Sequence, residues 1–271
     1  MRGRSVASNP IPMMYITEPK PTEGFHWTQT PWGRALVCDE LARHAPHLFT
    51  AGDLELRSDD REWAAVAQLL DVPRARIRLI SQFHGADIAV VRRGDSDDYT
   101  PGRADGIVTD DCSVAIAVRV ADCAPVLIAD TTQPAVAAIH AGWRGTMQGV
   151  VGEGVRRLSE EFGSHPANLI AAIGPCLGPC CGEMGPEVPM MFREAGHGDA
   201  TVERWFATGP SGRPYFDLWQ ANRDQLETAG VDREKIFSAG LCTRSHPEVF
   251  HSYRAKGPEA GRMVGIIRAR G

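Results

Sequence analysis

The sequence lacks a long uninterrupted run of apolar residues. Its most apolar segment, residues 114–128, contains Arg119 and Asp122 and falls short of the roughly 20 apolar residues that a membrane-spanning helix needs. The first twenty residues carry Arg2, Arg4 and only a short apolar patch at 13–16, and so lack the apolar core of a signal peptide. We therefore expect a soluble, cytoplasmic protein.

An excess of positive charge is also missing. The 29 Lys and Arg residues face 34 Asp and Glu residues, which gives a net charge of -5. This balance argues against a general nucleic-acid binder or a protein of acidic membrane surfaces, and it favours a small-molecule substrate. Oligomeric state is not predictable from these features.

Low-complexity tracts and internal repeats are absent, and 43% of the 271 residues are apolar, enough for a large buried core. Residues 1–33 are rich in proline and polar residues without a sustained period, and they predict an irregular N-terminal arm. No later segment reads as a linker. We therefore expect one domain over residues 34–271.

A disulfide framework is not indicated. The seven cysteines are odd in number and irregularly spaced, which favours reduced thiols. Cys176, Cys180 and Cys181 suggest a metal knuckle, but no second Cys or His pair stands at zinc-finger spacing. Their role stays open at this point.

Alternating helix and strand signals predict a mixed α/β protein. Apolar, β-branched runs predict strands at 77–80, 88–91, 106–109, 114–120, 126–129 and 135–139, several of them buried on both faces. Helical spacing predicts helices at 59–70, at 146–162, near 186–195 and after Asp217 as N-cap. Strands at 249–253 and 263–267 are expected to end the chain.

Three polar clusters stand beside these strands, at residues 81–85, 121–126 and 138–145, and they offer His84, Cys123 and His140 as ligands of one metal ion. Two imidazoles and a thiolate favour zinc, and three protein ligands leave the open position typical of catalytic zinc. The spacing matches no short zinc motif. The alternative is that each histidine is structural and that Cys123 is a small buried hydrophobic residue.

The same clusters hold three further candidate catalytic residues. Asp122 is a carboxylate between two apolar runs, which requires a partner or a role in proton transfer. Gln82 is a polar side chain beside a predicted core strand. Arg144 precedes the expected helix start after Gly145 and suits phosphate or carboxylate, unless Trp143 anchors the loop and Arg144 is a solvated surface charge.

A series of ordered motifs covers roughly residues 77–268. They are Gln82-x-His84-Gly85, Ala104-Asp105-Gly106, Ala121-Asp122-Cys123-x-Pro125-Val126, His140-Ala141-Gly142-Trp143-Arg144-Gly145, Ile173-Gly174-Pro175-Cys176, Ser252-Tyr253-Arg254 and Gly261-Arg262-Met263. In these motifs the chain resembles the YfiH/YlmD family, also known as DUF152, multicopper polyphenol oxidase (laccase) and purine nucleoside phosphorylase.

This resemblance implies a β-sandwich of mixed sheets flanked by helices, with zinc bound by His84, Cys123 and His140. It implies phosphorolysis of purine nucleosides (adenosine, inosine, guanosine and methylthioadenosine) together with hydrolytic deamination of adenosine. Family members usually carry a Thr-Arg-x-Gly-Gly-Val-Ser segment upstream of the first zinc histidine. Residues 49–54 here lack that arginine and glycine pair, which implies a changed substrate-binding loop.

Other functions remain open at the level of sequence. Copper-dependent phenol oxidation requires several copper sites, usually built from paired histidines, whereas the nine histidines here include no His-x-His pair. A hydrolase that edits peptidoglycan precursors would use Cys123 as nucleophile and His140 as base. A non-enzymatic binding protein is the last alternative.

Overall fold

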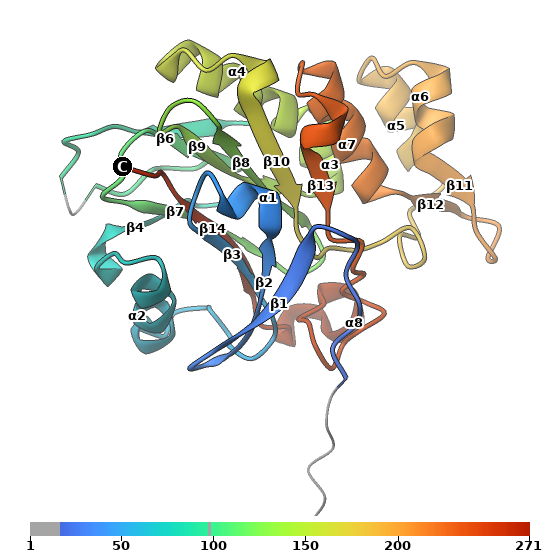
Figure 1. Cartoon of the computed structure of the whole chain (residues 1–271). Coiled ribbons are helices and arrows are strands. Elements are labelled where there is room, and N and C mark those ends of the chain that lie inside the picture. The colour runs from blue at the N-terminus through green and yellow to red at the C-terminus, as the bar shows by residue number, and fades with distance from the viewer. Residues whose placement is uncertain (1–16, 97–98) are drawn as a thin grey trace, which may run out of the picture.

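Two mixed β-sheets form the centre of the molecule (Figure 1). The computed structural model describes residues 17–96 and 99–271. The first sheet has the order β1-β2-β3-β14-β7-β4 and the second β13-β10-β8-β9-β6-β5, with β11-β12 as a separate hairpin. The strands are β1 Phe25–Thr30, β2 Gly33–Cys38, β3 His47–Thr50, β4 Ile77–Leu79, β5 Ile88–Val91, β6 Gly106–Thr109, β7 Ala115–Val120, β8 Ala124–Asp130, β9 Val136–Ala141, β10 Leu169–Ile173, β11 Phe206–Thr208, β12 Pro214–Phe216, β13 Ile236–Ser238 and β14 Met263–Arg268.

The main core lies between the two sheets. Phe49 and Val118 from the first sheet and Leu127 from the second belong to one buried cluster. A Cβ at Gly174 or Gly265 would lie 2.3 or 3.3 Å from the Phe49 ring, so glycine at these positions permits the close approach. All residues of β8 and β9 are buried, because these central strands are covered on both faces as predicted.

Helices cover the outer faces of the sandwich (Figure 1). Trp63 and Val66 of α2 pack on the first sheet, and Val151 and Leu158 of α4 pack on the second. The helices are α1 Asp39–Ala42, α2 Asp60–Leu69, α3 Trp143–Met147, α4 Val150–Phe162, α5 Val188–Glu194, α6 Asp199–Trp205, α7 Leu218–Thr228 and α8 Tyr253–Lys256, with short 3₁₀ helices at η1 Arg74–Arg76, η2 Pro166–Asn168, η3 Arg233–Lys235 and η4 Gly257–Glu259. The predicted α/β class, a β-sandwich flanked by helices in a single domain, is confirmed.

Some local predictions differ from the structure. The arm expected over residues 1–33 contains strand β1, which pairs with β2 so that Phe25 lies opposite Cys38 and Thr30 opposite Gly33. The polar residues of β1 suit a half-exposed edge strand. Residues 1–16 of that arm lie outside the described residues. The helix predicted at 146–162 is divided into α3 and α4, because Gly149 has a φ of 79° that interrupts the helix.

The strand predicted at 249–253 is also wrong. The backbone N–H groups of Val249 and Phe250 both bond to the His246 carbonyl in a turn, and Ser252 then caps α8 by accepting from Ala255. Local hydrogen bonds therefore replace strand pairing in this segment. In the described part of the chain, no helix is both long and apolar enough to cross a membrane.

Candidate metal and substrate site

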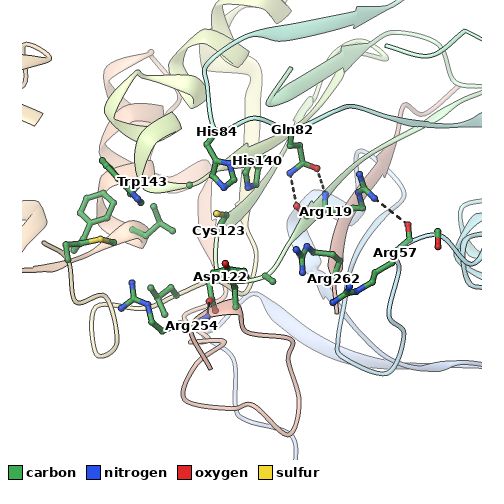
Figure 2. A pocket seen from close by; sticks show the side chains of 18 residues that line it. Arg57, Gln82, His84, Arg119, Asp122, Cys123, His140, Trp143, Arg254 and Arg262 are labelled. Atoms are coloured by element: carbon green, nitrogen blue, oxygen red, sulfur yellow. Dashed lines mark hydrogen bonds between the residues drawn. The ribbon is translucent and has the colours of Figure 1, made fainter. Parts of the chain in front are cut away.

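A cavity of about 830 Å³ contains the three predicted metal ligands on its wall (Figure 2). His84 follows β4, Cys123 immediately precedes β8 and His140 lies in β9. One ligand atom from each of the three lies within 4.8 Å of the others, and the two imidazole rings are 4.9 Å apart at 77°. The fold therefore brings together three residues from separate segments.

Asp105, which the sequence did not single out as a site residue, holds both histidines. Its carboxylate accepts a hydrogen bond from the ring Nδ1 of His140 at 2.8 Å. It also accepts hydrogen bonds from the backbone N–H groups of Phe83, His84 and Gly85, at 3.2, 2.9 and 2.7 Å. Burial alone raises the pKa of Asp105, but these bonds and the charge of His140 hold it below its usual value. With Nδ1 bound to a carboxylate, the Nε2 atom of His140 is left for a ligand.

The surroundings of Cys123 fit a cation. Burial raises the pKa of the Cys123 thiol, but the charge of His140 and hydrogen bonds to His140 and His84 outweigh it and lower the pKa to about 6. A thiolate is the form that binds metals. Gly142 leaves room beside the sulfur, because a Cβ there would lie 2.8 Å from Cys123 Sγ and 3.2 Å from His84 Cδ2. The donor set and this space suit zinc or another thiophilic ion.

Asp122 lines the cavity, and both of its carboxylate oxygens are engaged. One oxygen accepts the Thr243 hydroxyl at 2.6 Å and the other accepts the backbone N–H of Arg254 at 2.6 Å. Asp122 also has a φ of 87°, an uncommon left-handed conformation for a residue other than glycine. In this arrangement the side chain orders the segments that carry Thr243 and Arg254.

Gln82 also lines the cavity but uses its amide to bind the backbone of β7. Its Nε2 donates to the Arg119 carbonyl at 2.7 Å, and its Oε1 accepts the Arg119 N–H at 2.9 Å. Gln82 thereby fixes the position of Arg119 (Figure 2). Arg144 is exposed, stacks over Trp143 at 4.3 Å and is absent from the cavity lining. Helix α3 begins at Trp143, so Gly145 lies inside the helix instead of before it.

Four arginines that the sequence did not assign to the site line the cavity: Arg57, Arg119, Arg254 and Arg262. Within the described residues, no carboxylate oxygen lies within 4.0 Å of the guanidinium nitrogens of Arg119, Arg254 or Arg262, and the nearest to the Arg57 guanidinium is Glu55 at 3.9 Å. Burial and the charge of Arg262 lower the pKa of Arg119. Arg254 and Arg262 stand in recognised motifs, whereas Arg57 carries no sequence signal.

Known proteins share this fold and part of this sequence. Residues 52–270 match the family described as multi-copper polyphenol oxidoreductase laccase. The chain belongs to this family. The purine nucleoside phosphorylase YlmD of Geobacillus stearothermophilus is 34% identical over 212 residues, or 76% of each chain. The crystal structure of that YlmD superposes with a TM-score of 0.79 at 28% identity and covers 90% of this chain and 99% of YlmD.

A purine nucleoside phosphorylase of Bacteroides thetaiotaomicron is 34% identical over 163 residues, and this chain spans only 60% of its length. The resemblance drawn from the motifs is thus confirmed at the level of the YfiH/YlmD family. Within this family, the His84, Cys123 and His140 group and the arginines around it form the candidate active site.

Proposed function

We propose that this protein is a metal-dependent purine nucleoside phosphorylase that also deaminates adenosine. The observation that carries the proposal is the division of one cavity into two sides, with Arg57, Arg119 and Arg262 on one and Trp143 on the other (Figure 2). His84, Cys123 and His140 lie between these sides. The names of the relatives support the reaction class.

The arginine side suits phosphate. Guanidinium groups bind phosphate oxygens in pairs, and arginines without a close carboxylate retain donors for such a ligand. Burial and the charge of Arg262 lower the pKa of Arg119. The Arg119 backbone is held by the Gln82 side chain, and Arg262 Nη1 donates to the carbonyls of Ala260 and Gly261. A phosphate dianion placed here would relieve the repulsion between the two cations.

The opposite side suits a purine ring. Trp143 lies on this side (Figure 2), and the cavity lining as a whole includes further apolar and aromatic side chains. Among them is Tyr253, which is 52% exposed, a high exposure for a large aromatic residue. The larger apolar residues that line the cavity are Trp143, Leu177, Met184, Phe216, Leu218 and Tyr253. The cavity volume is within the usual range for sites that bind small molecules. Adenosine, inosine, guanosine and methylthioadenosine share the purine and ribose groups that such a site would recognise.

In phosphorolysis, a phosphate oxygen forms a bond to the ribose C1′ carbon while the bond from C1′ to purine N9 breaks. The electron pair leaves with the purine, which takes up a proton, and ribose 1-phosphate is released. The arginines hold the phosphate, and Asp105 keeps the His140 ring oriented. His84, Cys123 and His140 would hold a zinc ion, which would supply Lewis-acid chemistry for the deamination of adenosine, in which adenosine and water give inosine and ammonia.

Arginine substitutions test the phosphate side. We expect Arg119→Gln and Arg262→Gln to raise the KM for phosphate by at least tenfold with little change in the KM for nucleoside, because the lost contact is to phosphate. The sequence suggested Arg144 as the phosphate-binding residue, but Arg144 lies outside the cavity lining. Arg144→Gln is therefore expected to change the KM for phosphate less than Arg119→Gln does. A larger phosphate defect in Arg144→Gln than in Arg119→Gln would contradict the assignment.

The activity itself is measured by incubating metal-replete protein with adenosine and phosphate. Adenine and ribose 1-phosphate are expected from phosphorolysis, and inosine from deamination. The proposal fails if none of these products forms while YlmD from Geobacillus stearothermophilus is active under the same conditions. Metal analysis of protein purified without added metal decides between zinc and the copper of a phenol oxidase.

Replacement of Cys123 separates a metal ligand from a nucleophile. If Cys123 is a metal ligand, the Cys123→Ala variant is expected to lose both zinc and activity. Retained zinc with lost activity would instead support the hydrolase alternative, in which Cys123 attacks the substrate with His140 as base.

A further inference from the structure

A second group of thiols lies outside the His84, Cys123 and His140 site. The Sγ atoms of Cys180, Cys181 and Cys242 all lie within 4.8 Å of one another. Cys242 is buried, Cys181 is partly buried and Cys180 is exposed, so the group reaches the surface on one side. The sequence suggested Cys176 as the partner of Cys180 and Cys181, whereas the fold groups them with Cys242 from the segment after β13.

The spacing of Cys180 Sγ and Cys181 Sγ matches tetrahedral coordination, and Cys242 Sγ lies within 4.8 Å of both. Bonds of about 2.3 Å from zinc to sulfur require sulfur atoms roughly 3.8 Å apart. Cys180 Sγ and Cys181 Sγ are 3.7 Å apart. The Ser245 hydroxyl oxygen lies 3.3 and 3.5 Å from the same two sulfurs, close to the roughly 3.5 Å expected between sulfur and oxygen ligands of one zinc ion. Ser245 therefore stands where a fourth ligand, or the water it holds, would be.

The backbone fixes these sulfurs. The N–H of Thr243 bonds to the Cys176 carbonyl at 3.0 Å, which joins the two segments, and the turn carrying Cys181 is closed by its N–H to the Gly178 carbonyl at 3.0 Å. The Gly178 N–H also donates to Cys242 Sγ at 3.3 Å, as outer hydrogen bonds to metal ligands commonly do. The thiols are thus held close together by bonds that do not require a metal.

The group also adjoins the main cavity. Arg254, a cavity residue, donates from Nη1 to the carbonyls of Cys181 and Glu183 at 3.3 and 2.9 Å. Its backbone N–H bonds to Asp122 at 2.6 Å. Ordering the loop that carries Cys181 would therefore hold the carbonyls that Arg254 binds.

We propose that Cys180, Cys181 and Cys242 form a second, structural zinc site, with Ser245 or a water molecule as the fourth ligand. Three thiolates from two tied segments select a thiophilic cation over the harder magnesium and calcium ions. The group holds no imidazole and lies outside the cavity lining, and this distinguishes it from the cavity site.

The experiment titrates Zn²⁺ into reduced, metal-free, full-length protein against a chromophoric chelator. The Cys180→Ser/Cys181→Ser double variant is expected to bind one ion fewer than the wild type, while Cys112→Ser, which removes a remote, partly buried thiol, binds the same number as the wild type. His84→Ala is expected to lose the cavity ion and to retain this one. Equal zinc numbers in the wild type and the double variant would overturn the proposal.

Cobalt supplies a second measurement that does not depend on activity. Charge-transfer absorption from thiolate to Co²⁺ increases with the number of thiolates bound, so most of it is expected to disappear in the double variant and to persist in His84→Ala. If the double variant does not fold, the exposed Cys180→Ser single variant takes its place, with at least a tenfold loss of affinity at the second site expected. An unchanged affinity and an unchanged spectrum in Cys180→Ser would reject the site.

Discussion

Asp105 organises the candidate metal site, although it is not one of the three candidate ligands. A buried carboxylate is unfavourable unless its oxygens are satisfied, and here one imidazole and three backbone N–H groups satisfy them. The three N–H groups are consecutive, which requires the chain to turn back at His84, where φ is 65°. Asp105 therefore fixes one histidine through its ring and the other through its backbone.

We expect Asp105→Asn to lower metal affinity by roughly 10-fold to 100-fold, since the His140 ring loses its charged partner. Chelator competition measures this affinity. Asp130→Asn is the matched control, because Asp130 is also buried and accepts hydrogen bonds from Thr132 and Gln133. It lies at the end of β8 that is away from Cys123. A similar loss of affinity in both variants would point to general destabilisation instead of loss of the Asp105 bond.

At the scale of elements, the break between α3 and α4 sets the direction of the chain after His140. Gly149 has a φ of 79°, a conformation that is unfavourable for a residue with a side chain. The buried residues that follow still face the second sheet; they are Val150, Val151, Val155 and Leu158. The apolar stripe alone predicted one continuous helix, because both parts share the same period. The backbone conformation of one glycine decides the break.

This break yields a matched pair of substitutions. A Cβ at Gly149 or at Gly152 meets no heavy atom within 4 Å, so alanine would not clash with neighbouring residues at either position. Gly149→Ala is expected to lower the free energy of unfolding by about 1 kcal/mol through backbone strain. Gly152→Ala, inside α4, is expected to raise it by about 0.5–1 kcal/mol. Urea unfolding measures both, and destabilisation of equal size in the two variants would refute the explanation.

At the scale of the whole molecule, a buried histidine in the first sheet couples folding to pH. His47 of β3 donates from Nδ1 to the Ala45 carbonyl and accepts the Cys38 N–H at Nε2, which requires the neutral ring. Burial, only partly opposed by the Ala45 bond, lowers the pKa of His47 to about 4. Protonation would place a donor against the Cys38 N–H, in the interior of the sheet.

As the pH falls below 6.5, the unfolded chain takes up this proton before the folded protein does. The stability due to His47 is therefore complete above pH 6.5 and is lost progressively as the pH falls toward 4, by roughly 3 kcal/mol in all. His47→Gln is expected to flatten the dependence of unfolding free energy on pH across this window. Denaturant unfolding at a series of pH values tests it, and parallel curves for the two proteins would count against His47.

The sequence determined the parts of the fold that depend on local pattern. Buried strands such as β8 and β9 are visible as apolar runs, and the cap of α7 is visible as Asp217, which accepts the Gln220 N–H. The three metal-ligand candidates were identifiable because each is a polar residue beside an apolar run, and the ordered motifs indicated the family.

The tertiary structure decided which groups meet. The arginines on one side of the cavity come from separate segments, as do the partners of Asp105 and the third thiol beside Cys180 and Cys181. Sequence spacing carries no information on such contacts, because they arise where distant segments pack at the ends of two sheets. Chemical identity is therefore local and readable from the chain, whereas the charge balance and hydrogen bonding that determine each residue's role are properties of the packed molecule.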